Sequence, residues 1–121
     1  MTGCPPILHC AIAQMNARLG DVDGNIREAR RLAHQAAAQG ARLIILPEGC
    51  LTGNAIGSPA QQAVLPLEPG PFQPLSECAA AQNITICAGF AAAFGDKFNV
   101  VHAIVEPAGR VLFQRKAFRA S

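Results

Sequence analysis

Glu48 is the residue whose type and position in this sequence best suit chemistry. It follows a short apolar run at residues 43–46 and then Pro47, and Gly40 precedes that run. A run of this length between a glycine and a proline favours a buried strand over a helix, and Pro47 ends the strand because it has no N–H to donate. A carboxylate at the carboxyl end of such a strand lies where open α/β sheets bind ligands, and burial there raises its pKa toward that of a general base. Glu48 is therefore a candidate base, and the alternative is a solvated loop residue.

The cysteines are the other residues with potential chemistry. Their number, five, is odd and no two have CxxC spacing, so we expect free thiols in a reducing cytoplasm. The histidines do not pair with them at zinc-ligand spacing, so no metal site is expected. Cys50 lies two residues after Glu48, and neighbours two apart on an extended chain point the same way, which makes a nucleophilic role conceivable. We nevertheless interpret Cys50 as a packing residue in the site wall, Cys10 and Cys87 as core strand residues, and Cys78 as the inner face of a helix.

Composition restricts the class of protein. The 121 residues are 50% hydrophobic and 15% charged with a net charge of +2, which is typical of one packed domain or part of one. No basic run stands out, and three arginines on one predicted helix (Arg27, Arg30 and Arg31) indicate a solvated face better than a nucleic-acid footprint. The first residues lack a signal-peptide pattern and no apolar run has transmembrane length. We therefore expect no nucleic-acid or membrane partner and a cytoplasmic location.

Alternating strands and helices are predicted to position Glu48. A first strand at residues 7–15 and the strand at 43–46 flank a helix at 25–39, whose apolar residues recur at helical spacing. Asp21 or Asp23 can cap the start of this helix, and Gly40 suits a left-handed cap at its end. These elements form a βαβ unit, which is almost always right-handed.

The second half of the sequence completes a mixed sheet. A loop at residues 52–71, rich in glycine and proline, is interpreted as a wall of the site next to Glu48, with a surface excursion of no role as the alternative. The last two strands are expected to pair as a hairpin around residues 106–109. This order predicts one α/β domain. The predicted helix and strands that follow the loop are at residues 72–82, 84–90, 98–105 and 110–115.

Short motifs in this order resemble the nitrilase, or carbon–nitrogen hydrolase, superfamily. Each motif is weak alone, but their order and spacing are specific, and the resemblance covers nearly the whole chain. The opening motifs are Gln14-x-Asn16, Gly20-Asp21-x-x-Gly24-Asn25, Leu46-Pro47-Glu48 and Leu51-Thr52-Gly53. The later block is Phe98-Asn99 through Pro107-x-Gly109-Arg110 to Arg115-Lys116.

The resemblance implies a fold, a mechanism and a substrate class. The fold is a four-layer αββα sandwich, of which residues 1–121 would form an incomplete, roughly N-terminal half. The mechanism uses Glu, Lys and Cys: Glu48 matches the general base that activates the thiol, and Lys116 matches the lysine that stabilises the tetrahedral intermediate. On composition alone, Lys116 is an ordinary surface lysine. The substrate would be a small amide or nitrile, and thiol hydrolysis needs neither a metal nor an organic cofactor.

The sequence departs from the family pattern at its end. The family's nucleophilic cysteine lies a few dozen residues beyond the lysine, whereas this sequence ends at Ser121, and Phe118 and Arg119 stand where a histidine often follows. We therefore expect the chain to be inactive alone. Because the missing half would leave apolar sheet surface bare, we also expect a homo-oligomer or dependence on a complementing C-terminal polypeptide. The alternatives are a non-catalytic remnant that acts as a binding module, and the glutaminase part of a glutamine-dependent NAD synthetase.

Overall fold

The protein forms a mixed five-stranded sheet, as the order of predicted elements requires. The computed structural model describes residues 7–55 and 59–115, so Lys116 lies outside the described residues. The strand order is β1-β2-β3-β4-β5, with the first two pairs parallel and the last two antiparallel. The α/β class and the mixed sheet are confirmed. The strands are β1 (Cys10–Ile12), β2 (Leu43–Ile45), β3 (Thr85–Phe94), β4 (Lys97–Val105) and β5 (Val111–Arg115).

Two α-helices alternate with the parallel strands. Helix α1 (Val22–Ala38) begins three residues before the predicted start, because the Asp21 side chain caps it by accepting the N–H three residues on. Gly40, two residues past its end, has a φ of 91°, which is the left-handed conformation predicted there. Helix α2 (Gln73–Gln82) ends in the same way at Asn83, with φ 51°. Of the helices in the described residues, none is long and apolar enough to cross a membrane.

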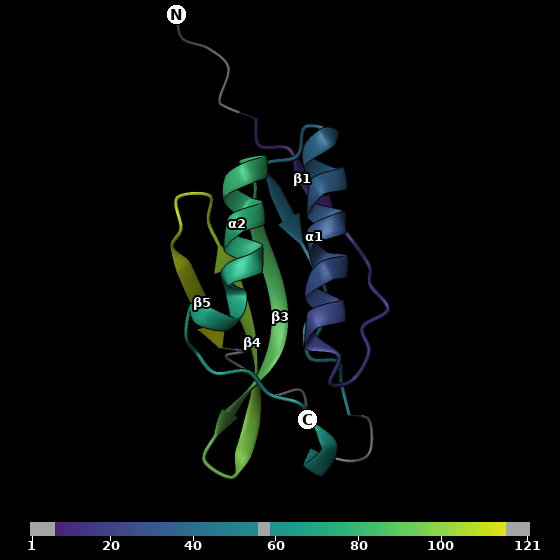
Figure 1. The fold of residues 1–121 in the computed structure, drawn as a ribbon, viewed down its shortest axis with the longest axis vertical. Coiled ribbons are helices and arrows are strands. Elements are labelled where there is room, and N and C mark those ends of the chain that lie inside the picture. Colours follow the sequence, from purple (N-terminus) through teal and green to yellow (C-terminus); the bar gives the residue numbers. More distant parts are fainter. Residues whose placement is uncertain (1–6, 56–58, 116–121) are drawn as a thin grey trace, which may run out of the picture.

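Both helices lie side by side on one face of the sheet (Figure 1). Small side chains bring α1 close to the strands, because its buried residues include Ala29, Ala33 and Ala36. Three phenylalanines close the core beside α2, with ring centroids 5.0–6.0 Å apart. These rings are Phe72, Phe90 and Phe113. The core therefore fills the space between the helices and one sheet face.

The opposite face of the sheet carries an apolar row that no described helix covers. One residue from each strand stands in register across the whole sheet: Ile12, Ile45, Cys87, Ile104 and Leu112. We call this set the open-face row. Ile12 is 82% exposed, and Ile45 and Leu112 are each 40% exposed. The described residues therefore form one helix layer and one sheet layer, an incomplete sandwich as predicted.

The open face explains one wrong prediction about the thiols. Cys10 is exposed rather than in the core, because it alternates onto the same uncovered face as Ile12. Cys87, also on this face, is only partly buried. Cys78 is buried on α2, as predicted. All four cysteines of the described residues are free thiols.

Strands β1 and β3 and the loop at 52–71 also differ from their predictions. Strand β1 has three residues instead of the nine predicted at 7–15, although the Ala13 N–H still reaches the Ile45 carbonyl at 3.1 Å. Strand β3 continues past residue 90 to Phe94 because it pairs with β4 from Ile86 to its end. The predicted loop at 52–71 contains two short 3₁₀ turns, η1 (Pro59–Gln61) and η2 (Gly70–Phe72). The β4–β5 hairpin is confirmed, and Gly109 at its turn has φ 102°.

Candidate functional site

Glu48 lies in a tight turn at the carboxyl end of β2, as predicted. The Leu46 N–H still bonds to the Cys87 carbonyl at 2.9 Å, and Pro47 then ends the ladder. Gly49, with φ 68°, lets the chain reverse, and the Gly53 N–H closes the turn on the Gly49 carbonyl at 2.8 Å. We call residues 47–53 the Glu48 turn.

The expected burial of Glu48 is wrong. Glu48 is exposed, whereas the five residues that follow it in the Glu48 turn are buried. The same turn shows that Glu48 and Cys50 do not lie on an extended strand. The argument from extended-chain spacing therefore does not apply to them, although both residues line the cavity described next.

A cavity of about 320 Å³ adjoins Glu48. Its walls come from two segments that follow neighbouring parallel strands: residues 15–17 after β1 and the Glu48 turn with Asn54 after β2. The Asn16 motif and the Glu48 motif, 32 residues apart in the sequence, therefore meet at the carboxyl edge of the sheet. Amide and carboxylate groups around one cavity can hold a small polar ligand and accept a proton from it. The loop was predicted to form a site wall, and in the described residues only Gly53 and Asn54 of it do so.

Gly89 in the middle of β3 makes room for the Glu48 turn. A Cβ atom at this position would lie 2.6 Å from the Gly49 nitrogen, 2.7 Å from the Pro47 carbonyl oxygen and 2.8 Å from the Glu48 Cα. The turn therefore rests directly on the β3 backbone. From the sequence, Gly89 is predicted only as part of a strand, although an isolated glycine within a strand is a signal of close backbone approach.

Cys50 is part of the cavity wall and also of the hydrophobic core. It is 1% exposed, and burial raises the pKa of its thiol to about 11. About one such thiol in ten thousand is ionised at pH 7, and the thiolate is the nucleophilic form. The interpretation of Cys50 as a packing residue therefore agrees with its environment.

Strand β5, which ends at Arg115, comes level with the Glu48 turn. Gly89, His102 and Gln114 stand in register on β3, β4 and β5, so β5 ends level with the Glu48 turn. Two strand spacings separate β3 from β5, about 10 Å. The Arg115 guanidinium stacks 3.9 Å from the centroid of the Phe94 ring and fixes this end of β5.

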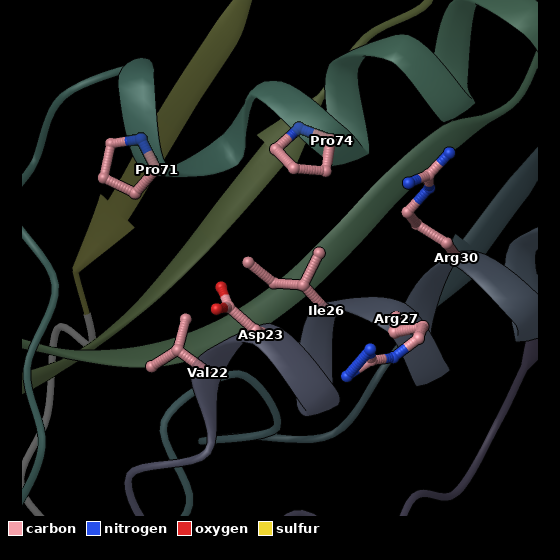
Figure 2. Close-up of a pocket in the computed structure, with 7 residues that line it drawn as sticks. All are labelled: Val22, Asp23, Ile26, Arg27, Arg30, Pro71 and Pro74. Atoms are coloured by element: carbon pink, nitrogen blue, oxygen red, sulfur yellow. The ribbon is translucent and has the colours of Figure 1, made fainter.

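A second cavity, of about 310 Å³, lies between α1 and the start of α2 and shares no residue with the Glu48 cavity. Figure 2 shows Arg27 and Arg30 from α1 on one side, facing Pro71 and Pro74 on the other. Both arginines are exposed. This cavity offers a solvated groove rather than catalytic groups.

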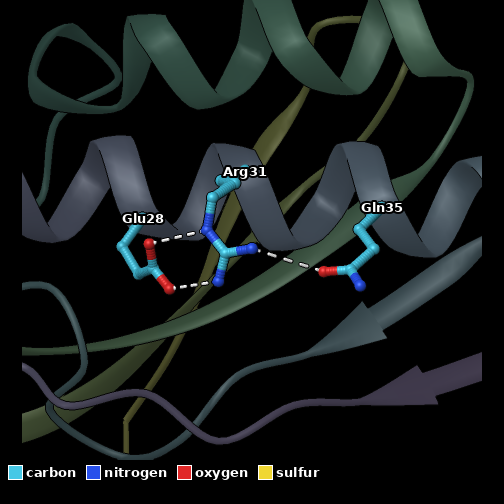
Figure 3. A network of polar contacts seen from close by, with 3 residues as sticks. All are labelled: Glu28, Arg31 and Gln35. Carbon is cyan, nitrogen blue, oxygen red and sulfur yellow. Dashed lines mark hydrogen bonds and ion pairs between the residues drawn. The ribbon is translucent and has the colours of Figure 1, made fainter.

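The exposed side of α1 is solvated as predicted. Arg31 bonds to the Glu28 carboxylate at 2.6 and 2.9 Å and to Gln35 at 3.4 Å (Figure 3). The hydrogen bond from Arg31 lowers the pKa of Glu28. In the described ranges, no three histidine, cysteine or acidic side chains gather in a way that could hold a metal ion.

Solved structures share this fold. An amidase from Nesterenkonia sp. matches with a TM-score of 0.77 and 21% identity over 94% of this chain and 44% of that one. A CN-hydrolase superfamily protein from Xanthomonas campestris matches with a TM-score of 0.72 and 18% identity over 90% of this chain and 40% of that one. A glutamine-dependent NAD(+) synthetase from Cytophaga hutchinsonii matches with a TM-score of 0.70 and 21% identity over 93% of this chain and 19% of that one. The chain thus spans less than half the length of each.

These similarities define an α/β protein with the nitrilase fold. The carbon–nitrogen hydrolase family model matches residues 9–117, which is most of the sequence. The chain therefore belongs to the carbon–nitrogen hydrolase family. Among curated proteins, no relative matches the sequence.

Proposed function

We propose that residues 1–121 are the N-terminal portion of a carbon–nitrogen hydrolase that acts on a small amide or nitrile. The observation that carries this proposal is the cavity at the carboxyl ends of β1 and β2, where Glu48 meets the Asn16 segment. Family membership supports the reaction class. Mutant forms of the Nesterenkonia amidase were solved with acrylamide and with butyramide, which supports small amides as the first substrates to test.

The proposed mechanism gives Glu48 and Lys116 complementary tasks. The Glu48 carboxylate takes the proton of a cysteine thiol supplied from outside these 121 residues. The thiolate attacks the amide carbon, and the Lys116 ammonium stabilises the oxyanion that forms. Glu48 gives the proton to the amide nitrogen, so that the C–N bond breaks and ammonia leaves. Water then hydrolyses the thioester, which releases the carboxylic acid and restores the thiol. Lys116 directly follows the residue that ends β5 level with the Glu48 turn, which supports its role.

The open-face row supports the proposal of a partner. A sheet with parallel strands is normally covered on both faces. The open-face row is a continuous apolar surface across five strands, and an exposed surface of this kind favours association with another polypeptide. We propose a homo-oligomer or a complementing C-terminal polypeptide as the cover, in the cytoplasm that the cysteine pattern predicts.

The test is reconstitution of amide hydrolysis. The chain is mixed with a separately expressed polypeptide that corresponds to the unmatched second half of the amidase, and ammonia release from butyramide is measured. We expect no turnover by the chain alone and turnover by the mixture. Glu48→Gln and Lys116→Met should each lower the rate by about 100-fold or more, the usual scale for acid–base and oxyanion groups. Glu68→Gln, a matched change at an exposed loop glutamate, should leave the rate unchanged.

Two results would contradict this proposal. Turnover by the chain alone that Cys50→Ala abolishes would make Cys50 the nucleophile. A stable mixture without activity on amides or nitriles would favour the non-catalytic binding module. The likeness to the NAD(+) synthetase makes glutaminase activity the second candidate, so glutamine is included among the substrates.

A further inference from the structure

Asn25 is a buried polar side chain that binds outside its own helix. It lies in the first turn of α1 and is 4% exposed. Its Oδ1 accepts the Arg18 N–H at 2.9 Å, and its Nδ2 donates to the Arg18 carbonyl at 2.8 Å and to the Leu51 carbonyl at 3.0 Å. Both amide hydrogens are thus used, and none of the three bonds supports α1 itself.

The partners of Asn25 belong to the two segments that enclose the Glu48 cavity. Arg18 directly follows the wall at residues 15–17, and Leu51 belongs to the Glu48 turn. The same two segments also touch directly, because the Gly20 N–H donates to the Thr52 carbonyl at 2.9 Å. Asn25 therefore connects the two segments that form the walls of the Glu48 cavity.

Leu51 is fixed from both sides. Its carbonyl accepts from Asn25, and its N–H donates to the Gly89 carbonyl on β3 at 2.9 Å. The other end of the turn is fixed by the bond from the Leu46 N–H to β3. Glu48 lies between these two anchors, so the position of its carboxylate depends on both. Other side chains also hold the turn, because the Thr52 hydroxyl accepts the Ala91 N–H of β3 at 3.1 Å. Gln62 donates to the Gly53 carbonyl at 2.7 Å. Asn25 differs from these in that it also binds Arg18, next to the opposite wall of the cavity.

We propose that Asn25 is a positioning residue that holds the Glu48 turn, and with it the proposed base, against the Asn16 segment. This inference rests on the proposed function of Glu48 for its catalytic meaning. Asparagine suits the task because it supplies one acceptor and two donors. Aspartate at the same position could still accept from Arg18 but could donate to neither carbonyl.

Backbone amide exchange in the full chain tests the proposal. In Asn25→Ala, exchange at Arg18, Gly20 and Gly53 should rise about tenfold relative to amides in the middle of α1, because buried partners lose their bonds. In Asn25→Asp, the Arg18 amide should stay protected, whereas exchange at the Gly53 amide should rise. General destabilisation would raise the exchange rate at both amides. Ile26→Val is the matched control on the same helix turn, and it should show no local difference.

The same variants in the reconstituted enzyme separate this inference from the proposed function. Asn25→Ala should lower the rate constant for butyramide hydrolysis about tenfold, and Ile26→Val should not. If the reconstituted wild type is inactive, the proposed function fails while the exchange pattern still decides the role of Asn25. A uniform rise in exchange, or unfolding of both Asn25 variants while Ile26→Val folds, would overturn the positioning role and make Asn25 a general core residue.

Discussion

At the residue scale, burial gives Glu48 and Cys50 opposite properties although they are two residues apart. Glu48 is exposed at the mouth of a cavity, and Cys50 lies in the core beneath it. The turn between them, closed by Gly49 in a left-handed conformation, produces this separation. The Glu48 carboxylate lines the cavity from an exposed residue, and the Cys50 thiol is buried. This difference agrees with the proposal that Glu48 is the base and that the nucleophilic cysteine lies outside these 121 residues.

The Cys50 thiol should make stability fall at alkaline pH. Burial raises its pKa from the ordinary 9.0 to about 11, so the folded state keeps a proton that the unfolded state loses. The stabilisation is therefore complete below pH 9 and is lost as the pH rises through 11. A shift of this size corresponds to at most about 3 kcal/mol. Urea unfolding at several pH values from 8 to 11 measures the loss.

Two alanine variants identify the group responsible. Cys50→Ala should show a smaller fall of the unfolding free energy between pH 9 and 11 than the wild type. Cys10→Ala is the matched control, because that thiol is exposed. An equal fall in the wild type and in Cys50→Ala would show that the Cys50 thiol does not retain its proton in the folded chain.

At the element scale, β3 is the support on which the Glu48 turn rests, and Gly89→Ala should disturb that support. The added Cβ would lie within 2.8 Å of backbone atoms of Pro47, Glu48 and Gly49, which cannot move independently of the turn. We expect a loss of about 1–3 kcal/mol, the usual cost of overpacking, together with lower activity of the reconstituted enzyme. Urea unfolding and butyramide turnover measure the two effects.

A second glycine provides the control for this change. Gly70→Ala adds the same methyl group where no atom lies within 4 Å. It should therefore leave stability and turnover close to the wild type. Equal effects of the two substitutions would mean that the contact between β3 and the Glu48 turn is not what limits residue size at Gly89.

Single residues in the sequence predicted where the helices and strands lie, whereas features that depend on tertiary contacts could not be predicted from the sequence. Gly40 and Pro47 marked the end of a helix and of a strand correctly, because backbone conformation at these residues depends on the residue itself. The length of β1 and the reach of β3 depend on which strand pairs alongside, which a sequence pattern does not contain. Glu48 could be located from its neighbours in sequence. The roles of Asn25 and Gly89 depend on residues far away in the chain.

At the scale of the whole molecule, helices cover one face of the sheet, and no helix of the described residues covers the other. The helices bury the first side, and the open-face row crosses all five strands on the second. The fold class was predictable, because the resemblance to the carbon–nitrogen hydrolase family implies a sandwich of two sheets. The chain spans less than half the length of its solved relatives, which agrees with an incomplete sandwich. The exposure of individual residues such as Cys10 could not be predicted from the sequence, because it depends on what covers the second face of the sheet.

The isolated chain should associate through the open-face row. Apolar side chains in register over five strands form the kind of patch that drives association. Sedimentation velocity over a concentration series should show oligomers in the wild type, and Ile45→Lys or Leu112→Lys should shift the chain toward monomer. Leu67→Lys is the matched control, because Leu67 is also 40% exposed but lies in the loop at 52–71. A wild-type chain that stays monomeric at every concentration would contradict this expectation. Oligomers unaffected by either row variant would place the contact elsewhere.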